Sequence, residues 1–385
     1  MARPVAIVGT GQTRHCKARP DVHQGELIQE AVKIALLDAD LSWEDIDAIV
    51  LTNMELFEGR ALPELWCGEF AGGLGKPVMK VATGGTSGTS GAIAGLMQAA
   101  SGVFDTVLVV GWEKHSEGST QTGMSLTDPA WDRHIASGAI GNFALSISQY
   151  VAERGVTEEQ AAMVAVKARR NGALNPNTHL KDAGITVEKV LASPMLAEPV
   201  HLLDMCPQSD GAAALVIVGG DKTARYKNPA WFWGSATRHD QPYIGDHDQR
   251  MVKMRTLRSA AQEVYRKVGI SNPFKEIDIA EIYEPVSYAE LAWYEALGFC
   301  KEGDAGKLIE SGATQIGGEL PVNPSGGVLC ANPVGATGVI RVAEAVKQLH
   351  RKAGDYQVDG ARRALVTGYG VYAWSDVMFF SAEQP

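Results

Sequence analysis

The sequence has few cysteines, and none of them has the spacing of a zinc site or a disulfide framework. The five cysteines lie far apart and form no Cys-x-x-Cys pair. An odd number of widely spaced cysteines is typical of a protein kept in a reducing compartment. We therefore expect a cytoplasmic protein without structural disulfides and without a metal site.

Long hydrophobic runs and an excess of positive charge are also lacking. No run approaches the roughly 18 apolar residues of a membrane helix, and the N-terminal apolar run is too short for a signal peptide. The 35 basic and 45 acidic residues leave a formal charge of -10. This balance argues against a nucleic-acid partner or an anionic membrane surface, so an anionic ligand would need a local basic cluster.

What the sequence does have is an alternation of β-rich runs and helical periodicity that occurs twice. In both halves a glycine-rich turn leads into a helix and then into an apolar strand. The turn "GTSGAI" at 88–93 is echoed by "GATGVI" at 335–340. Alternating strands and helices predict an α/β protein with parallel or mixed sheets covered by helices.

The alternation also predicts how the chain is divided. Residues 1–112 and 206–250 form the expected N-terminal half, and residues 251–385 form the expected C-terminal half. Between them, residues 113–205 show a looser pattern with polar and glycine-rich loops. Such an excursion from a compact core is often a lid or a binding loop, so we expect it to cover a site.

Several separated motifs resemble the thiolase superfamily, especially the sterol-carrier-protein and archaeal type. They are "VAIVGTGQTRH", "SPMLAEPVHLLDMCPQSDGAAALVIV", "EIYEPVSYAELAWYEALGFC" and "NPSGGVLCANPVGATG", which occur in the family's order over nearly the whole chain. The resemblance implies a thiolase fold, with duplicated α/β halves in a layered α-β-α-β-α sandwich and a loop-rich insertion. It also implies coenzyme A as a substrate, no covalently bound cofactor, and a homodimer.

The family's nucleophilic cysteine is missing. It belongs to a Cys-x-Ser-Gly motif at a helix N-terminus, and counting back from Glu113 places Gly85 on the cysteine and Ser87 and Gly88 on the Ser-Gly. In the family, the helix dipole and backbone N–H groups stabilise the thiolate. Those donors remain, so we expect Gly85, Ser87 and Gly88, with Gly368 and Tyr369 of the "TGYG" loop, to bind a thioester oxygen.

Two further catalytic loops depart from the family pattern. The His-Asp-x-Phe loop corresponds to Tyr283-Glu284-Pro285-Val286, and the Gly-His-Pro loop corresponds to Ala331-Asn332-Pro333. Tyr283 and Asn332 can donate hydrogen bonds to an enolate or thioester oxygen, but Asn332 cannot act as a general base. We expect Glu284 to orient its neighbours rather than to act as a base.

Cys330 precedes Asn332 by two residues in this loop and allows two interpretations. In the first interpretation it is a catalytic thiol, either a displaced nucleophile or a base for coenzyme A. In the second it is a small buried apolar residue, as single cysteines often are.

Candidate groups for the coenzyme A phosphates or for a distal substrate carboxylate are basic. Arginines suit both, although most such charges simply form a solvated face. The candidates are Arg169 and Arg170 in the insertion, Arg238 and Arg250 around "RHDQPYIGDHDQR", and His115 of "WEKHSEG".

At a finer level, the motifs resemble the thiolase subunit of the benzoylsuccinyl-CoA thiolases of anaerobic toluene degradation and, less closely, the steroid side-chain retro-aldolases. Both kinds work with a small zinc-ribbon plus OB-fold subunit, which implies a heterotetramer. We expect CoA-dependent thiolysis of a branched aromatic 3-oxoacyl-CoA such as 2-benzoylsuccinyl-CoA to benzoyl-CoA and succinyl-CoA. Retro-aldol cleavage of a 3-hydroxyacyl-CoA and a catalytically silent acyl-CoA-binding scaffold stay open as alternatives.

Overall fold

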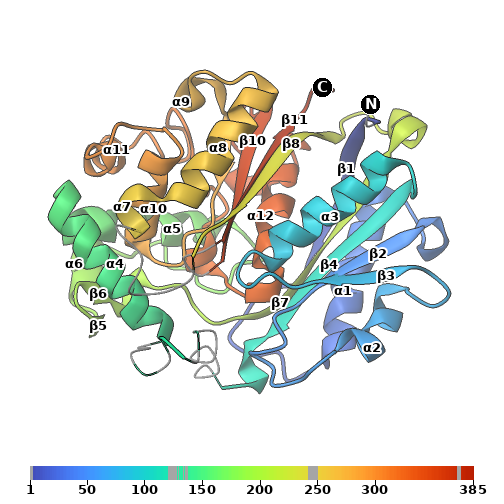
Figure 1. Ribbon diagram of the computed structural model, residues 1–385, viewed down its shortest axis with the longest axis horizontal. Coiled ribbons are helices and arrows are strands. Elements are labelled where there is room, and N and C mark those ends of the chain that lie inside the picture. The colour runs from blue at the N-terminus through green and yellow to red at the C-terminus, as the bar shows by residue number, and fades with distance from the viewer. Residues whose placement is uncertain are drawn as a thin grey trace.

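A nine-stranded mixed sheet is the centre of the protein (Figure 1). The computed structural model describes residues 3–119, 128, 130–132, 134, 138–241, 250–370 and 374–385. The first half of the sheet contains, in spatial order, β3 (Val78–Val81), β2 (Ala48–Thr52), β4 (Thr106–Lys114), β7 (Asp210–Gly219) and β1 (Val5–Gln12). The second half contains β8 (Ala230–His239), β11 (Trp374–Ser381), β10 (Arg363–Gly370) and β9 (Ile279–Glu281).

Helices cover both halves of the sheet and also fill the space between them, as Figure 1 shows. The outer helices of the first half are α1 (Gln24–Ala39) and α2 (Glu64–Cys67), and those of the second half are α8 (Arg255–Val268) and α10 (Ser287–Ala296). The central layer consists of α3 (Ser87–Ser101) and α12 (Val334–Leu349). The expected α-β-α-β-α layering is therefore confirmed.

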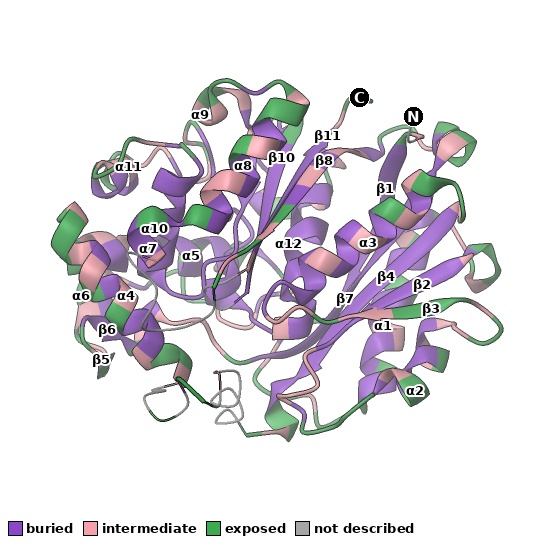
Figure 2. Cartoon of the chain, viewed as in Figure 1, coloured by how far each residue is buried: buried purple, intermediate pink, exposed green. Residues whose placement is uncertain are grey.

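The layering follows from the apolar pattern of the strands. In β4, Val107 and Val109 pack in the core around α3 and α12, whereas Leu108 and Val110 pack in the core around α1. Successive side chains of a strand point to opposite faces, so a continuous apolar run marks a strand covered on both sides. Figure 2 shows the result, with α12 buried along almost its whole length.

The two halves of the sheet meet at β1 and β8, which pair only at Ala6–Trp231 and Ile7–Ala230. From there β8 pairs antiparallel with β11 along almost its full length, from Trp231–Ser381 to His239–Trp374. Strand β8 therefore belongs to the second half. The boundary expected at residue 250 stays a prediction. The sequence could not show the pairing of β8 with β11, because an isolated strand does not reveal its pairing partner.

The insertion is mainly helical and packs on the C-terminal half. Its elements are α4 (Gly138–Arg154), α5 (Glu158–Leu174), α6 (Val187–Leu191) and a hairpin of β5 (Met195–Ala197) and β6 (Val200–His201). Helix α5 lies against α10 and α11 (Ala305–Glu310). Two short helices, α7 (Arg250–Lys253) and α9 (Pro273–Glu276), complete the second half. In the described parts of the chain, no helix is both long and apolar enough to cross a bilayer.

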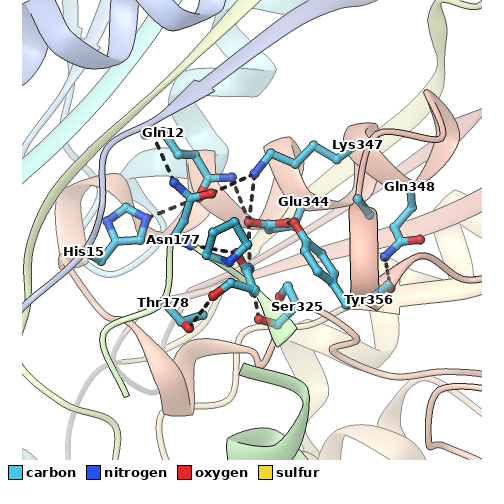
Figure 3. Close-up of polar contacts among 12 residues, drawn as sticks. Gln12, His15, Asn177, Thr178, Ser325, Glu344, Lys347, Gln348 and Tyr356 are labelled. Carbon is cyan, nitrogen blue, oxygen red and sulfur yellow. Dashed lines mark hydrogen bonds and ion pairs between the residues drawn. The ribbon is translucent and has the colours of Figure 1, made fainter. Parts of the chain in front are cut away.

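A buried polar cluster joins the N-terminal strand, the insertion and α12 (Figure 3). Glu344 of α12 accepts hydrogen bonds from Gln12 Nε2 at 2.8 Å and from the Tyr356 hydroxyl at 2.6 Å. Lys347 Nζ reaches both Glu344 and Asn177 of the insertion at 3.4 Å. Burial by itself would raise the pKa of Glu344, but Lys347 and the Tyr356 hydroxyl outweigh burial and hold the pKa below its ordinary value.

The close approach of α3 and α12 generates a first prediction. A Cβ on Gly338 would fall far inside contact distance of the Thr89 backbone nitrogen. We expect Gly338→Ala to lower the free energy of unfolding by about 2–4 kcal/mol, because neither backbone can move without disturbing the central layer. Urea unfolding measures the effect.

Gly68 provides the matched control. Its backbone is already helical at φ -58° and ψ -33°, and a Cβ there would meet only Val78 Cγ1 at 4.0 Å. We expect Gly68→Ala to be neutral or to stabilise by about 0.4–1 kcal/mol. Equal losses in the two variants would contradict the tight crossing.

Candidate active site

Two helix N-termini meet at the centre of the molecule. Helix α3 begins at Ser87 and α12 at Val334, and the helices cross where Gly88 faces Gly338. A Cβ on Gly88 would lie 2.6 Å from the Val339 backbone nitrogen, so the contact is backbone against backbone. Each N-terminus carries a partial positive charge. The N-terminus of α3 therefore favours an oxygen that gains negative charge.

Gly85 lies directly before this point, and no side chain fits there. A Cβ on Gly85 would overlap the carbonyl oxygen of Tyr369 and would lie 3.3 Å from the Cα of Gly370. The end of strand β10 therefore occupies the volume that a cysteine at position 85 would need. The sequence has no cysteine at position 85, and the packing leaves no room for one.

The other residues of the glycine turn are held by local hydrogen bonds. The Ser87 hydroxyl donates to the Gly84 carbonyl at 2.6 Å and accepts from the Thr83 backbone N–H at 2.9 Å. A Cβ on Gly368 would overlap the Thr89 side chain, and the Tyr369 ring packs edge-on against Trp293 at 4.8 Å. The five residues that were expected to bind a thioester oxygen thus lie around the start of α3, where Ser87 closes the turn.

Tyr283 and Asn332 are brought together as a pair. Tyr283 lies in the loop between β9 and α10, and its hydroxyl is 3.5 Å from Asn332 Oδ1. The Thr337 hydroxyl, on the first turns of α12, donates to the same oxygen at 2.8 Å. Burial raises the pKa of Tyr283 above its ordinary value, so its hydroxyl stays protonated and can donate a hydrogen bond.

Cys206 completes this group, although it was not among the candidate site residues of the sequence analysis. Its thiol accepts a hydrogen bond from Asn332 Nδ2 at 3.2 Å, and burial raises its pKa to about 12. Ser209, three residues later, accepts from the Asn332 backbone N–H at 3.2 Å. Both residues belong to "CPQS", a segment distant in sequence from the other catalytic loops, and only the fold shows that they meet.

Cys330 points away from the pair. It is fully buried, its thiol donates to the Ala168 carbonyl of α5 at 3.1 Å, and it lies against Gly172. Burial raises its pKa. Of the two interpretations of Cys330, the geometry therefore supports the small packed residue and gives the displaced nucleophile no support.

Glu284 supports the loop that carries Asn332. Its Oε1 accepts from the Leu329 backbone N–H at 3.2 Å, and burial, reinforced by nearby Glu290, raises its pKa to about 8. A carboxyl group that is neutral at pH 7 can hold a loop without the cost of a buried charge. This position agrees with an orienting role.

The basic candidates have different surroundings. Arg169 is buried, and its guanidinium donates to the Leu329 carbonyl, so it supports the Asn332 loop and does not face a phosphate in solvent. Arg170, next to it on α5, is exposed. Arg238 forms an ion pair with Glu263. Arg250 begins α7, directly after residues 242–249, which lie outside the described residues.

His115 lies beside the start of α12. Its Nε2 is 3.4 Å from the Val334 backbone nitrogen, its ring stacks on Phe57 at 4.4 Å, and burial lowers its pKa to about 4. Glu113 accepts from the Gly335 N–H at 2.9 Å. Both side chains therefore cap α12. Among the described residues, no group of three or more histidine, cysteine, aspartate or glutamate side chains is arranged to hold a metal ion.

Two family models match this fold and together cover almost the whole chain. The family model described as "Thiolase, N-terminal domain" matches residues 5–221, and the model described as "Thiolase C-terminal domain-like" matches residues 236–380. The chain belongs to the thiolase superfamily. It is thus a thiolase-family enzyme, an acyltransferase by class, that breaks or forms carbon–carbon bonds of acyl-CoA.

Three similar proteins cover almost the whole chain. An acetyl-CoA acetyltransferase of Methanothermobacter thermautotrophicus is 32% identical over 96% of each chain. The benzoylsuccinyl-CoA thiolase subunit BbsB of Thauera aromatica is 28% identical over 95% of this chain and 94% of its own. Among solved structures, the Ltp2-ChsH2(DUF35) aldolase gives a TM-score of 0.85 at 26% identity, covering 98% of this chain and 97% of that one.

Glu284 generates a prediction about pH. Because its pKa is about 8 in the folded protein and near 4.5 when unfolded, the folded state holds the proton more tightly, and the free energy of unfolding falls as the pH rises from about 4.5 to about 8. Glu284→Gln removes this loss. We expect the variant to gain stability relative to wild type, on the order of a few kcal/mol by pH 8 and little at pH 4.5.

Urea unfolding of both proteins across this pH range measures the difference. Glu69→Gln, which changes an exposed carboxylate, is the matched control, and we expect its difference from wild type to stay flat. A flat difference for Glu284→Gln as well would show that Glu284 is ionised in the folded protein.

Proposed function

We propose that this protein cleaves a carbon–carbon bond of an acyl-CoA without forming an acyl-enzyme. The observation that carries the proposal is that the Tyr369 carbonyl lies where a Cβ would go at position 85, which we align with the family's nucleophile. The thiol of Cys330, which is turned toward α5, gives no replacement. A covalent thiolase cycle needs a thiolate at a helix N-terminus and a base beside it. The helix N-termini and the neutral donor Tyr283 support the reaction steps that need no thiolate.

Retro-aldol cleavage of a 3-hydroxyacyl-CoA is the reaction that we place first. The C3 hydroxyl proton leaves through water to solvent, C3 becomes a carbonyl, and the C2–C3 electron pair moves into the thioester as an enolate. Protonation of C2 then releases the shorter acyl-CoA. The positive end of α3 and the Tyr283 hydroxyl would stabilise the enolate oxygen. Similarity to the Ltp2-ChsH2(DUF35) aldolase supports this reaction.

Thiolysis of a branched aromatic 3-oxoacyl-CoA, such as 2-benzoylsuccinyl-CoA, is the second candidate. Similarity to the subunit BbsB favours it. Here coenzyme A would attack the C3 ketone directly, the C2–C3 bond would break, and the products would be benzoyl-CoA and succinyl-CoA. The same enolate forms on the leaving fragment, so the same site would serve. Arg170, which is exposed on α5, is the proposed contact for a phosphate of coenzyme A.

We further propose a heterotetramer, in which a homodimer carries two copies of a small zinc-ribbon plus OB-fold subunit. The DUF35 partner in the name of the similar Ltp2-ChsH2(DUF35) aldolase supports a second subunit. The edge strand β3 supports the homodimer, because Val78 and Met79 on it are 40% and 51% exposed and Met97 on α3 is 59% exposed. An open strand edge with apolar side chains is suited to pairing with a second copy across a two-fold axis.

The activity prediction concerns Tyr283. Chain co-expressed with a zinc-ribbon/OB-fold partner would be assayed with a 3-hydroxyacyl-CoA for release of an aldehyde or ketone. It would also be assayed with 2-benzoylsuccinyl-CoA plus coenzyme A for benzoyl-CoA. We expect Tyr283→Phe to lower kcat by about 10²–10³-fold, because one donor to the enolate oxygen is lost.

Cys330→Ala is the control, and we expect it to keep wild-type activity. Carbonyl release without consumption of coenzyme A supports the retro-aldolase, whereas benzoyl-CoA formation supports the thiolase. Acyl-CoA binding without turnover of either substrate would favour a silent scaffold subunit. Loss of activity in Cys330→Ala with an intact fold would instead support the interpretation of Cys330 as a displaced nucleophile.

The dimer prediction concerns the edge strand. We expect Met79→Asp to convert a dimer into monomers, because the interface would bury an unpaired charge. Light scattering after size exclusion measures the mass. Leu37→Asp on α1 is the matched control, since Leu37 is an apolar residue that is 82% exposed and lies outside the edge strand. Dissociation by both changes, or by neither, would contradict pairing through β3.

A further inference from the structure

Asp376 places a fully buried carboxyl group beside the start of α3. It lies on β11, and its Oδ2 accepts hydrogen bonds from the hydroxyls of Thr89 and Ser90, each at 2.8 Å. Both hydroxyls belong to the first turns of α3. Thr237, which faces Asp376 across the pair of β8 and β11, has a third hydroxyl beside the carboxyl group. The carboxyl group is therefore surrounded by hydroxyls at the helix end where the enolate oxygen is expected.

Asp376 differs from the paired acids of the interior. In the part of the chain that the structure describes, no lysine, arginine or histidine pairs with it, whereas buried Glu281, for example, pairs with Arg341. Burial raises the pKa of Asp376, although the hydroxyl hydrogen bonds act in the opposite direction. Fully buried acids without a cationic partner are uncommon in proteins. The positive end of α3 is what favours a negative charge on this one.

A chain of hydroxyls leads from Asp376 to the glycine turn before α3. The Ser90 hydroxyl, which donates to Asp376, accepts from the Thr83 hydroxyl at 2.8 Å. Thr83 is half-buried and begins the turn that contains Gly85. Each hydroxyl has one proton, and both protons point along the chain toward the carboxylate, so a lone pair of Thr83 Oγ1 is left to accept a proton at the turn. Thr86 is not a link, because its hydroxyl donates to the Thr83 carbonyl at 2.7 Å.

We propose that Asp376 takes up the proton that the reaction releases and returns it to C2, through the hydroxyls of Ser90 and Thr83. The C3 hydroxyl proton of the substrate passes to Thr83 Oγ1, the Thr83 proton to Ser90, and the Ser90 proton to Asp376. After the C2–C3 bond breaks, the transfers run backward and C2 receives a proton. In thiolysis the coenzyme A thiol would supply the first proton. This inference rests on the proposed function and replaces solvent as the destination of the proton.

The charges at the start of α3 favour this exchange. An ionised Asp376 and an enolate oxygen would both draw on the same positive helix end, and two like charges near one point oppose each other. Because Asp376 is protonated when the enolate forms, the helix end faces one negative charge at a time. Protonation of C2 removes the enolate charge, and Asp376 ionises again.

The first experiment needs no substrate. The infrared carbonyl band of a protonated Asp376 is isolated by subtracting Asp376→Asn from wild type and is followed with pH, and the same difference is recorded in each further background. We expect the midpoint to lie above the ordinary pKa of an aspartic acid. Ser90→Ala should raise it further, because the carboxylate loses a donor, whereas Thr83→Val should barely move it. A midpoint that Ser90→Ala leaves unchanged would overturn the proposal.

The second experiment measures turnover of the two candidate substrates as a function of pH. We expect Asp376→Asn to lower kcat about 10²–10⁴-fold and to abolish the fall of kcat/KM at acid pH, because the group that must be ionised is gone. Thr83→Val and Ser90→Ala interrupt the chain, and each should lower kcat about 10–100-fold. Thr89→Val is the matched variant. It removes the other α3 donor to Oδ2 and keeps the chain, so we expect a loss of no more than about fivefold.

Equal losses in Ser90→Ala and Thr89→Val would show that the hydroxyls only hold α3 against β11, and would overturn the proposal. An acid limb that persists in Asp376→Asn would overturn it as well. Asp359→Asn, which removes an exposed carboxylate, is the control and should keep full activity. If wild type turns over neither substrate, the proposed function fails, and the infrared titration still decides whether Asp376 holds a proton that Ser90 controls.

Discussion

The contact between the backbones of α3 and α12 is the constraint on which the rest of the structure depends. At Gly88 and Gly338 the helices approach so closely that neither position has room for a Cβ atom. The two helices form the middle layer, and both halves of the sheet pack their inner faces on this layer. The approach therefore fixes the distance between the halves. It also brings the N-terminus of α3 close to that of α12, where His115 and Glu113 already accept from the first N–H groups, so α3 is the end that favours an anion.

This arrangement explains how the site keeps its character without the family's cysteine and histidines. Partial charges of the backbone are set by the fold and survive the exchange of any single side chain. Side chains around them then determine which reaction the anion takes part in. Here the side chains are a neutral tyrosine, an asparagine and a protonated thiol, held by a loop that Glu284 and Arg169 support. Such a set favours hydrogen bonding over covalent attack.

The sequence was sufficient for the fold and for part of the site. Alternating periodicities identified the duplicated α/β halves, and the order of the motifs located Tyr283 and Asn332, which do meet. Local patterns could not show that β8 pairs with β11, because pairing is decided by segments far apart. They also could not show where a side chain points. Cys330 and Cys206 are both near Asn332 in the fold, and only the packing of α5 turns the first one away.

The carbonyl of Tyr369 beside Gly85 has a consequence for any attempt to install a nucleophile at this position. The Cβ of a cysteine at position 85 would overlap this carbonyl oxygen, and the Cα of Gly370 lies 3.3 Å away. A single Gly85→Cys substitution would therefore strain the backbone without producing a usable thiol. The substitution and the path of β10 are coupled, so the end of β10 would have to be redesigned together with position 85.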